Sequence, residues 1–344
     1  MYQINKNISK LQYLSNKADF EWKVVYEISN GLWHIIPFLE KDKINYRVDR
    51  YGHYMSIDLS NISKNKKNHF VYDGNYGLND SIVNKIFDDK IITTKILSNN
   101  GIKTPNELLL IKSDSIFSNS DNGYKALLKL IETIWYPIIC KPLSDMKGKG
   151  IMKINDNNWL KQFWEKFELW EFGNRHYIAQ QYIAWNDCRV LFLDWEVLIA
   201  YQRAPAQVSW DGRSTILELI SKNDIFMQNI DSISSYLNIH DYNIDDILED
   251  KQILQILPTA NISTWWTAKI IKLTEQDIER VRKIGKIWGA NYFGLDVIYD
   301  DNIKDWYVIE INKSPGIMGI ASVDENFASY FWQKVLDAIK KSAL

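Results

Sequence analysis

The sequence predicts an α+β fold, and three patterns support this interpretation. Two apolar runs, 293–299 and 306–311, flank a polar turn and predict a β-hairpin. A second strand pair, within 135–154, is interrupted by a loop with two glycines. Aromatic residues recur at helical spacing in 157–172, where a broad buried face is expected. Antiparallel hairpins combined with amphipathic helices indicate the α+β class.

Composition narrows the class of protein. The 344 residues allow two or three domains and a sizeable core. With 46% hydrophobic residues, 24% charged residues and a net charge of -2, there is no electrostatic case for a nucleic-acid partner. No apolar run reaches membrane-spanning length and the first ten residues lack a signal-peptide core, so we expect no membrane partner and a cytoplasmic protein. Cys140 and Cys188 are expected to be buried as small apolar side chains.

The order of apolar and polar segments predicts a small N-terminal domain and several helices and strands after it. Residues 1–85 alternate short apolar runs with polar turns and predict a small α/β domain without a chemical motif. A helix is expected to end at Gly101, because Pro105 blocks its continuation, and a strand should follow at 107–111. Further on, Ser214 is the expected N-cap of a helix, Thr274 begins an amphipathic helix with a capping box, and 325–342 form a terminal helix.

The glycine loop of 135–154 has features of a phosphate site. Strand 137–141 ends in Lys141, which supplies a positive charge, and glycines let backbone N–H groups approach phosphate oxygens closely. A flexible phosphate lid is therefore expected, and a plain hairpin turn with surface lysines is the alternative. The loop residues concerned are Lys147, Gly148, Lys149 and Gly150.

The segment 176–205 predicts a strand followed by a second hairpin. The strand over 177–183 can offer backbone groups to an adenine edge, and Asp187 stands where it can bind a ribose hydroxyl. Arg189 and Arg203 lie among apolar neighbours on the hairpin strands, where an arginine usually has an anionic partner.

The hairpin of 293–311 carries the clearest candidate site. Side chains alternate faces along a strand, so Glu310 and Asn312 point the same way, and Asp296 should lie nearly opposite Glu310. Two neighbouring carboxylates repel each other, and a divalent cation removes that cost. These hard oxygen ligands suit Mg²⁺. The alternative interpretation is an exposed strand face with ordinary charges.

Six segments, taken together in order, carry a resemblance. They are DK at 89–90, KPLSDMKGKG at 141–150, QQYIAWNDCRVLF at 180–192, WDGRSTILELI at 210–220, TANIST at 259–264, and GLDVIYDD with VIEINKSPG in 294–316. The chain thereby resembles the ATP-grasp superfamily, and within it the RimK-related module shared by cyanophycin synthetases and bifunctional glutathione synthetases. The resemblance implies an ATP-grasp fold of two α+β subdomains, 86–180 with the phosphate lid and 181–344 with the adenine hinge and metal site, after the domain 1–85.

The resemblance implies an ATP-dependent carboxylate–amine ligase. Such an enzyme forms a peptide or isopeptide bond on an amino acid or peptide through an acylphosphate, and converts ATP to ADP and phosphate. Two alternatives stay open: a macrocyclase that modifies a ribosomal peptide, and a nucleotide-binding protein without turnover that acts through a peptide partner. The expected cofactors are ATP and Mg²⁺, as two ions, with Mn²⁺ as a substitute, and the expected assembly is a homodimer.

The resemblance also assigns roles to residues. Nucleotide contacts fall to Lys90, Lys141, Lys147, Gly148, Lys149, Gly150, Gln180, Gln181, Tyr182, Ile183 and Asp187. The metal ligands are Asp296, Glu310 and Asn312. Arg203 and Lys141 are the catalytic assignments, Arg203 for stabilising the acylphosphate or tetrahedral intermediate. Substrate contacts fall to Arg189, Asn261, Ser263, Trp265, Trp266, Ser314 and Gly316. Two indoles at 265–266 replace the usual Gly-Gly, and Gln180 stands where glutamate is common, so the substrate stays open.

Overall fold

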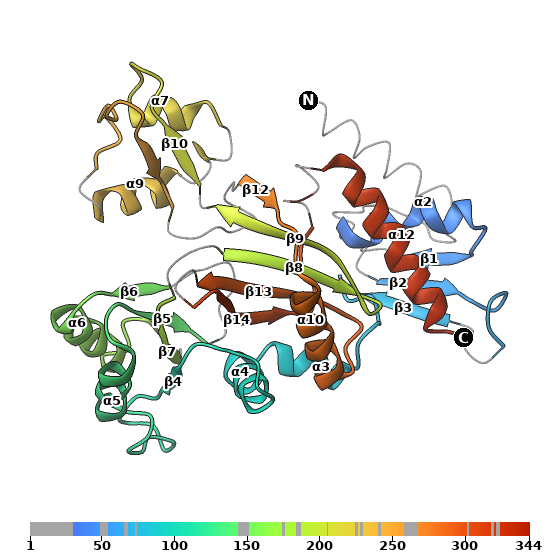
Figure 1. Cartoon of the computed structure of the whole chain (residues 1–344), viewed down its shortest axis with the longest axis horizontal. Coiled ribbons are helices and arrows are strands. Elements are labelled where there is room, and N and C mark those ends of the chain that lie inside the picture. Colours follow the sequence, from blue (N-terminus) through green and yellow to red (C-terminus); the bar gives the residue numbers. More distant parts are fainter. Residues whose placement is uncertain are drawn as a thin grey trace.

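The structure, a computed structural model of the chain, shows an α+β protein, as the sequence predicts (Figure 1). It describes residues 30–48, 54–64, 68–72, 74–143, 151–173, 176–183, 187–204, 206–223, 226–227, 230–239, 242–257, 267–300, 303–317, 320 and 324–344. Over these residues the strands form four sheets, and every strand pair is antiparallel. In the same residues, no helix is long and apolar enough to cross a membrane.

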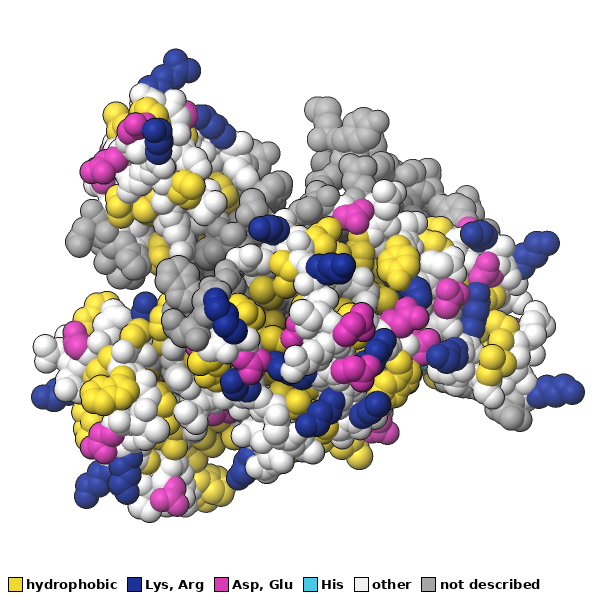
Figure 2. All heavy atoms as spheres, in the orientation of Figure 1, with side chains coloured by type: hydrophobic (Ala, Val, Ile, Leu, Met, Phe, Trp, Pro, Cys, Tyr) yellow, Lys and Arg dark blue, Asp and Glu magenta, His cyan; other side chains and the backbone are white. Residues whose placement is uncertain are grey.

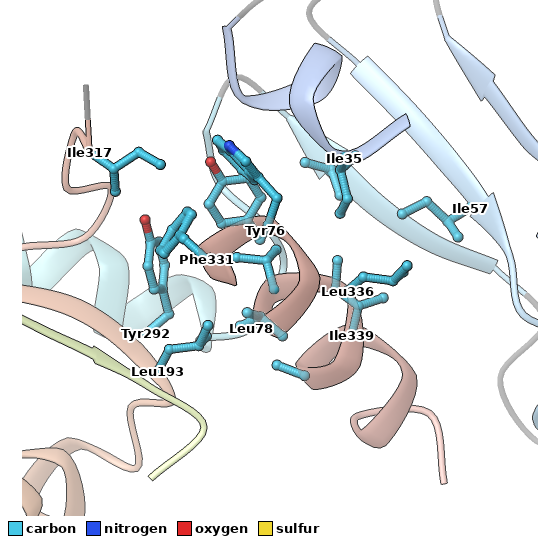
Figure 3. Close-up of a cluster of buried hydrophobic side chains, with 14 of the residues drawn as sticks. Ile35, Ile57, Tyr76, Leu78, Leu193, Tyr292, Ile317, Phe331, Leu336 and Ile339 are labelled. Atoms are coloured by element: carbon cyan, nitrogen blue, oxygen red, sulfur yellow. The ribbon is translucent and has the colours of Figure 1, made fainter. Parts of the chain in front are cut away.

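A three-stranded sheet in the order β1-β2-β3 packs with the first and last described helices. Its elements are α2 (Asn30–Lys41), β1 (Tyr46–Val48), β2 (Tyr54–Asp58), β3 (Asn68–Tyr72) and α12 (Glu325–Lys341). Figure 3 shows Ile35 of α2 and Leu336 of α12 in one hydrophobic cluster, together with Leu193 and Tyr292 of the central sheet. Segments far apart in sequence therefore share one core, which fixes the N-terminal sheet against the central sheet.

A four-stranded sheet in the order β4-β7-β5-β6 forms a second layer with two helices. Its elements are β4 (Glu107–Leu110), α5 (Tyr124–Ile134), β5 (Ile138–Pro142), β6 (Met152–Ile154), α6 (Asn157–Glu168) and β7 (Tyr177–Gln181). Phe163 and Phe167 of α6 are buried against Tyr177. Trp159 and Trp170 are 46% and 44% exposed, so the expected broad buried face is wrong at these positions. The helix ends at Glu168, and only one stripe of its surface meets the sheet.

The central sheet has five strands in the order β12-β9-β8-β13-β14. Its strands are β8 (Asp187–Leu193), β9 (Glu196–Ala204), β12 (Thr267–Ile270), β13 (Tyr292–Asp300) and β14 (Asp305–Asn312), and α10 (Glu275–Trp288), α3 (Ser81–Phe87) and α4 (Lys90–Asn99) pack with it. The predicted hairpin is confirmed as the β13–β14 pair. The predicted capping box of α10 is confirmed too, because Thr274 and Asp277 each accept a hydrogen bond from the other's backbone N–H.

One predicted helix end is confirmed and one predicted N-cap is wrong. The helix expected to end at Gly101 ends at Asn99, and it is separated from α3 because the Asp89 side chain accepts the Ile92 N–H at 3.0 Å and begins α4 as a new helix. The helix after 210 is capped by Thr215 in a capping box with Glu218, and not by Ser214. The hydroxyl of Ser214 instead donates to Asp211 at 2.7 Å.

A small insertion between β9 and β12 has its own core. It contains β10 (Gln207–Ser209), α7 (Ile216–Ser221), α9 (Ile230–Ile239) and β11 (Ile253–Gln255). Its buried side chains form a separate hydrophobic cluster, and Figure 1 shows the insertion at the upper left, away from the helices that cover the central sheet.

The described surface and the cysteines agree with the composition. On the face seen in Figure 2, basic and acidic side chains are interspersed, as the net charge of -2 leads one to expect. Cys140 and Cys188 are free and buried, in agreement with their predicted role as small apolar side chains.

Asp305 at the start of β14 gives a prediction of pH dependence. Burial acts to raise the pKa of Asp305, but hydrogen bonds from Lys103 and Arg280 outweigh it and lower the pKa from 3.8 to about 2. A depressed pKa contributes stability above pH 4 that is lost as the pH falls toward 2. We expect Asp305→Asn to lower the free energy of unfolding by about 1–2 kcal/mol at pH 7 and by much less at pH 2.

Urea unfolding at several pH values measures this difference. The control is Asp245→Asn, which alters an exposed aspartate of the insertion and should change stability little at any pH. A loss for Asp305→Asn that is the same at pH 2 and pH 7 would show that the ionised carboxylate is not the source of the stability.

Candidate functional site

One face of the central sheet changes from apolar to charged along its strands. Leu193, Leu191 and Tyr201 lie on this face in the core shared with the N-terminal sheet. Arg189, two residues before Leu191, continues the same face, and the register pairs it with Asp296 of β13. Asp296 is in turn paired with Glu310 of β14, which confirms that the two carboxylates lie on neighbouring strands. Strand alternation therefore places a row of charges beside a hydrophobic core.

Asp296 is the most highly coordinated carboxylate of the site. Arg189 donates from Nη2 to Oδ2 at 2.9 Å and from Nε to Oδ1, and Arg203 Nη2 lies 3.4 Å from Oδ1. Asn312 donates its amide nitrogen to Oδ2 at 3.1 Å. Burial acts to raise the pKa of Asp296, but the charges of Arg189 and Arg203 outweigh it and hold the pKa below its usual value. Asp296 is therefore ionised and surrounded by donors.

Asp187 and Arg203 form a second ion pair next to the first. Arg203 Nη2 donates to Asp187 Oδ1 at 2.5 Å, which is the kind of anionic partner that the sequence predicted for Arg203. Burial raises the pKa of Asp187, and the charge of Arg203 opposes that rise. Among the described residues, the Nε–H group of Arg203 has no hydrogen-bond partner. The two arginines and two aspartates thus form one compact, nearly neutral network.

Glu310 differs from Asp296 in its surroundings. Within the described part of the chain, its carboxylate makes no hydrogen bond and no ion pair. Burial raises the pKa of Glu310, the charge of Asp296 raises it further, and the charges of Lys90 and Lys141 oppose both. A carboxylate in this position has oxygen lone pairs available for a cationic ligand.

Lys141 reaches the site from the other sheet. It lies on β5, is 7% exposed, and donates from Nζ to the amide oxygen of Gln180 at 3.0 Å. Burial lowers the pKa of Lys141, while the carboxylates of Glu310 and Glu107 act in the opposite direction. Helix α4 packs against β14, the strand of Glu310, and Lys90 at its start lies 3.5 Å from the carbonyl oxygen of Leu143 after β5, so the charged face and the end of β5 approach each other.

Lys90 lies beside Lys141 at the beginning of α4. Its Nζ lies 3.5 Å from the carbonyl oxygen of Leu143, which follows β5. Asp89 caps this helix, so the position of Lys90 is set by the cap that separates α4 from α3. The structure therefore brings together both lysines that the sequence assigned to phosphate contacts.

Glu107 and Thr94 belong to the site, although they were not predicted from the sequence. Gln180 donates from Nε2 to Glu107 Oε2 at 2.8 Å, and the hydroxyl of Thr94 donates to Glu107 Oε1. Glu107 begins β4, whose other residues are leucines, and a lone carboxylate on an apolar strand was a signal that the sequence offered.

The residues of the predicted adenine hinge, 180–183, do not all face the same side. Gln180 is buried. Gln181 points to the other side of the strand, and its Oε1 accepts the Asn106 backbone N–H at 3.3 Å. The backbone N–H of Gln181 donates to the Asn106 carbonyl at 2.8 Å. Tyr182 lies under the Lys153 ammonium at 4.2 Å from the ring centroid, and Ile183 is buried.

The loop after β14 is held close to β13 by a glycine. A Cβ atom at Gly294 would lie 2.5 Å from the Pro315 Cβ, so only glycine permits this approach. Ser314 and Gly316, on either side of Pro315, are exposed. The other predicted contacts lie outside the described residues, namely Lys147, Gly148, Lys149, Gly150, Asn261, Ser263, Trp265 and Trp266.

The oxygen atoms near Asp296 and Glu310 have the chemistry that Mg²⁺ requires. Among the described residues no three His, Cys, Asp or Glu side chains are grouped as a metal site, so the carboxylates available are Asp296 and Glu310, with the Asn312 amide beside them. Oxygen ligands of this type fit Mg²⁺, which retains waters and binds through one or two carboxylates. Glu310 fits best, because the Asp296 oxygens already accept three hydrogen bonds and form an ion pair with Arg203.

Comparisons with known proteins agree on one family. Residues 87–215 match the family described as "RimK-like ATP-grasp domain". Cyanophycin synthetase of Synechocystis sp. is 28% identical over 203 residues, which cover 53% of this chain and 23% of that protein. The glutathione biosynthesis bifunctional protein GshAB of Pasteurella multocida is 25% identical over 277 residues, 72% of this chain and 35% of that protein.

A solved structure shows the same fold. The bifunctional glutathione synthetase from Pasteurella multocida superposes with a TM-score of 0.54 at 20% identity, covering 85% of this chain and 40% of that one. The chain thus spans between a quarter and two fifths of the proteins that it resembles. The predicted ATP-grasp fold is confirmed, and the homology to cyanophycin synthetase and GshAB is distant.

The ion pair between Arg189 and Asp296 gives a stability prediction. Arg189→Met keeps the bulk of the side chain but removes two of the donors to a largely buried carboxylate. Removing one partner of a buried pair leaves an uncompensated charge, and we expect the free energy of unfolding to fall by about 3 kcal/mol. Urea unfolding of the purified variant measures this loss.

A second variant separates lost charge balance from lost packing. Asp296→Asn in the Arg189→Met background removes the uncompensated charge and should recover at least part of the stability. If Arg189→Met alone is as stable as the wild type, the pair does not stabilise the sheet.

Proposed function

Because this chain carries a RimK-like ATP-grasp domain, we propose that it is an ATP-dependent carboxylate–amine ligase. The reaction proposed is formation of a peptide or isopeptide bond. The carboxylate of an amino acid or peptide first attacks the γ-phosphate of ATP, which gives an acylphosphate and ADP. An amine then displaces phosphate from the acylphosphate, and an amide remains.

One observation carries this proposal: Lys90 and Lys141 lie close to Glu310, a carboxylate that makes no hydrogen bond within the described part of the chain. Lys90 begins α4, Lys141 lies on β5, and Glu310 lies on β14. Their charges act on one another, since both lysines oppose the raised pKa of Glu310. Lysines can bind phosphate oxygens, and a carboxylate can bind the metal ion that accompanies ATP. Binding of a nucleoside triphosphate with its metal ion uses these groups together.

The residues of the charged face would act by position and charge. Lys90 and Lys141 would bind nucleotide phosphates, and Glu310 with Asn312 and Asp296 would hold Mg²⁺. When bound, the ion neutralises charge on the transferred phosphate. Arg203, fixed by Asp187 and Asp296, would stabilise negative charge on the reacting carboxyl group. No covalent nucleophile on the protein is needed for this chemistry.

The substrate class is proposed from the relatives. Cyanophycin synthetase and GshAB, by their names, take part in making cyanophycin and glutathione, and we propose an amino acid or short peptide as the substrate of this chain. Trp265 and Trp266 replace a Gly-Gly pair expected from the resemblance, and we propose that they contact the acceptor amine. ATP with Mg²⁺ or Mn²⁺ and a homodimeric assembly remain part of the proposal.

The test is release of ADP by the purified protein. With ATP and Mg²⁺, we expect ADP only when a carboxylate and an amine are both added from a panel of amino acids and short peptides. Mass spectrometry of the product identifies the bond that formed. Tight ATP binding without ADP release across the whole panel would favour the nucleotide-binding protein without turnover.

Glu310 gives the sharper prediction. Glu310→Gln keeps the shape of the side chain but removes the charge that would hold the metal ion, and ADP release should fall by about 100-fold or more. The control is Glu196→Gln, which changes an exposed glutamate on β9, paired with Lys334, at the far end of the same sheet. Circular dichroism checks that both variants are folded. Near-normal turnover of Glu310→Gln would show that the metal assignment is wrong.

A further inference from the structure

A chain of buried polar contacts connects four elements behind the lysines. It runs from Thr94 of α4 to Glu107 of β4, then to Gln180 of β7 and Lys141 of β5. Thr94, Gln180 and Lys141 are 2%, 4% and 7% exposed. Buried polar groups that are fully paired fix a single arrangement of their neighbours. The four linked side chains therefore hold one another in a single arrangement.

The direction of every hydrogen bond in the chain is fixed by chemistry. A lysine ammonium only donates and a carboxylate only accepts, so the Gln180 amide has one possible orientation between them. Its oxygen faces Lys141 at 3.0 Å and its nitrogen faces Glu107 at 2.8 Å. Gln180 is thus a neutral bridge that lets a carboxylate hold a lysine without contacting it.

These hydrogen bonds also connect the two parts of the proposed site, the helix α4 and the sheet of β5. Helix α4 carries Lys90 and packs against β14, the strand of Glu310. Strands β4, β7 and β5 belong to the other sheet, and β5 carries Lys141. The Thr94 hydroxyl reaches Glu107 from α4, so the carboxylate is the point at which helix and sheet are tied together.

We propose that Glu107 is a positioning residue for the nucleotide site: through Gln180 it supplies the counter-charge of Lys141, and through Thr94 it sets Lys141 beside Lys90. The inference rests on the proposed binding of ATP by these lysines. Glu107 touches no phosphate in this scheme. It acts only through the side chains that it holds.

The charged groups around Lys141 show why this counter-charge matters. Glu310, Glu107 and Asp296 favour its ammonium form, whereas burial and the charge of Lys90 disfavour it. Glu310 is the proposed metal ligand, so a bound cation would reduce its support for Lys141. Glu107, on β4, is the carboxylate in this group that the metal assignment does not use.

The decisive variant is Glu107→Gln, which removes the charge and should leave the fold intact. The new amide nitrogen can donate to the Thr94 oxygen, because the Thr94 hydroxyl can turn to the Lys90 carbonyl at 2.8 Å. We expect binding of ATP with Mg²⁺, measured by calorimetry without substrate, to weaken about tenfold. The thermal midpoint of the ligand-free protein should change little.

The exchange variant Glu107→Gln with Gln180→Glu provides the rescue. It moves the carboxylate one residue closer in the chain of contacts, so Lys141 regains its counter-charge directly. ATP affinity should return to within about threefold of the wild type. The matched control is Glu168→Gln, which alters a glutamate of the same sheet layer that caps the Ser113 backbone away from the site, and ATP affinity should not change.

Three results of the ATP-binding measurements would overturn the proposal. The first is ATP binding by Glu107→Gln within about twofold of the wild type, and the second is an exchange variant no better than the single variant. If Glu107→Gln does not fold, Thr94→Val and Thr94→Ser decide instead. The proposal requires weaker ATP binding in Thr94→Val only, and equal binding in the two is the third contrary result.

A ligand-free measurement separates this proposal from the proposed function. Competitive acetylation followed by mass spectrometry reports the unprotonated fraction of the Lys141 amine. Loss of the Glu107 charge should make Lys141 several-fold more reactive at a given pH, and the exchange variant should reverse this. A wild-type protein that binds no ATP would overturn the proposed function, while unchanged reactivity of Lys141 would overturn the role of Glu107.

Discussion

The pairing of Arg189 with Asp296 across β8 and β13 is the constraint on which the candidate site depends. Asp296 is largely buried, and without a partner its ionised form would be costly there. With Arg189 and Arg203 beside it, Asp296 remains ionised on β13 and lies directly opposite Glu310 on β14. The arginines therefore permit two carboxylates to occupy neighbouring strands, and Glu310 keeps its oxygens available.

The same sheet uses its two faces differently. One face is apolar along its length and packs against α10 and the α3–α4 pair. The other face is apolar only where the N-terminal sheet and α12 cover it, and it is charged beyond that cover. A single set of strands thus provides stability through burial and a polar surface for ligands. The register of the hairpin, in which Gly294 allows Pro315 to approach, decides where the apolar part of this face ends and the charged part begins.

Local patterns in the sequence were sufficient for much of this. The alternation of apolar residues in 293–311 predicted the hairpin and placed Asp296 opposite Glu310, because strand periodicity and a short turn leave little choice of register. The Thr274 capping box was also readable. Where prediction failed, local side-chain geometry decided: Asp89 caps a new helix directly after Asp88 ends α3, and Thr215 caps α7 where the adjacent Ser214 was expected.

By itself, the sequence determined the α+β class, the ATP-grasp resemblance and the residues that carry charge near the ends of strands. Only the tertiary structure decided their partners. Glu107 is 34 residues from Lys141 in number and belongs to another strand, yet the strand order β4-β7-β5 brings them to either side of Gln180. Arg203 likewise meets Asp187 and Asp296 through the order β9-β8-β13. Strand order depends on how distant segments pack, and local periodicity carries no information about it.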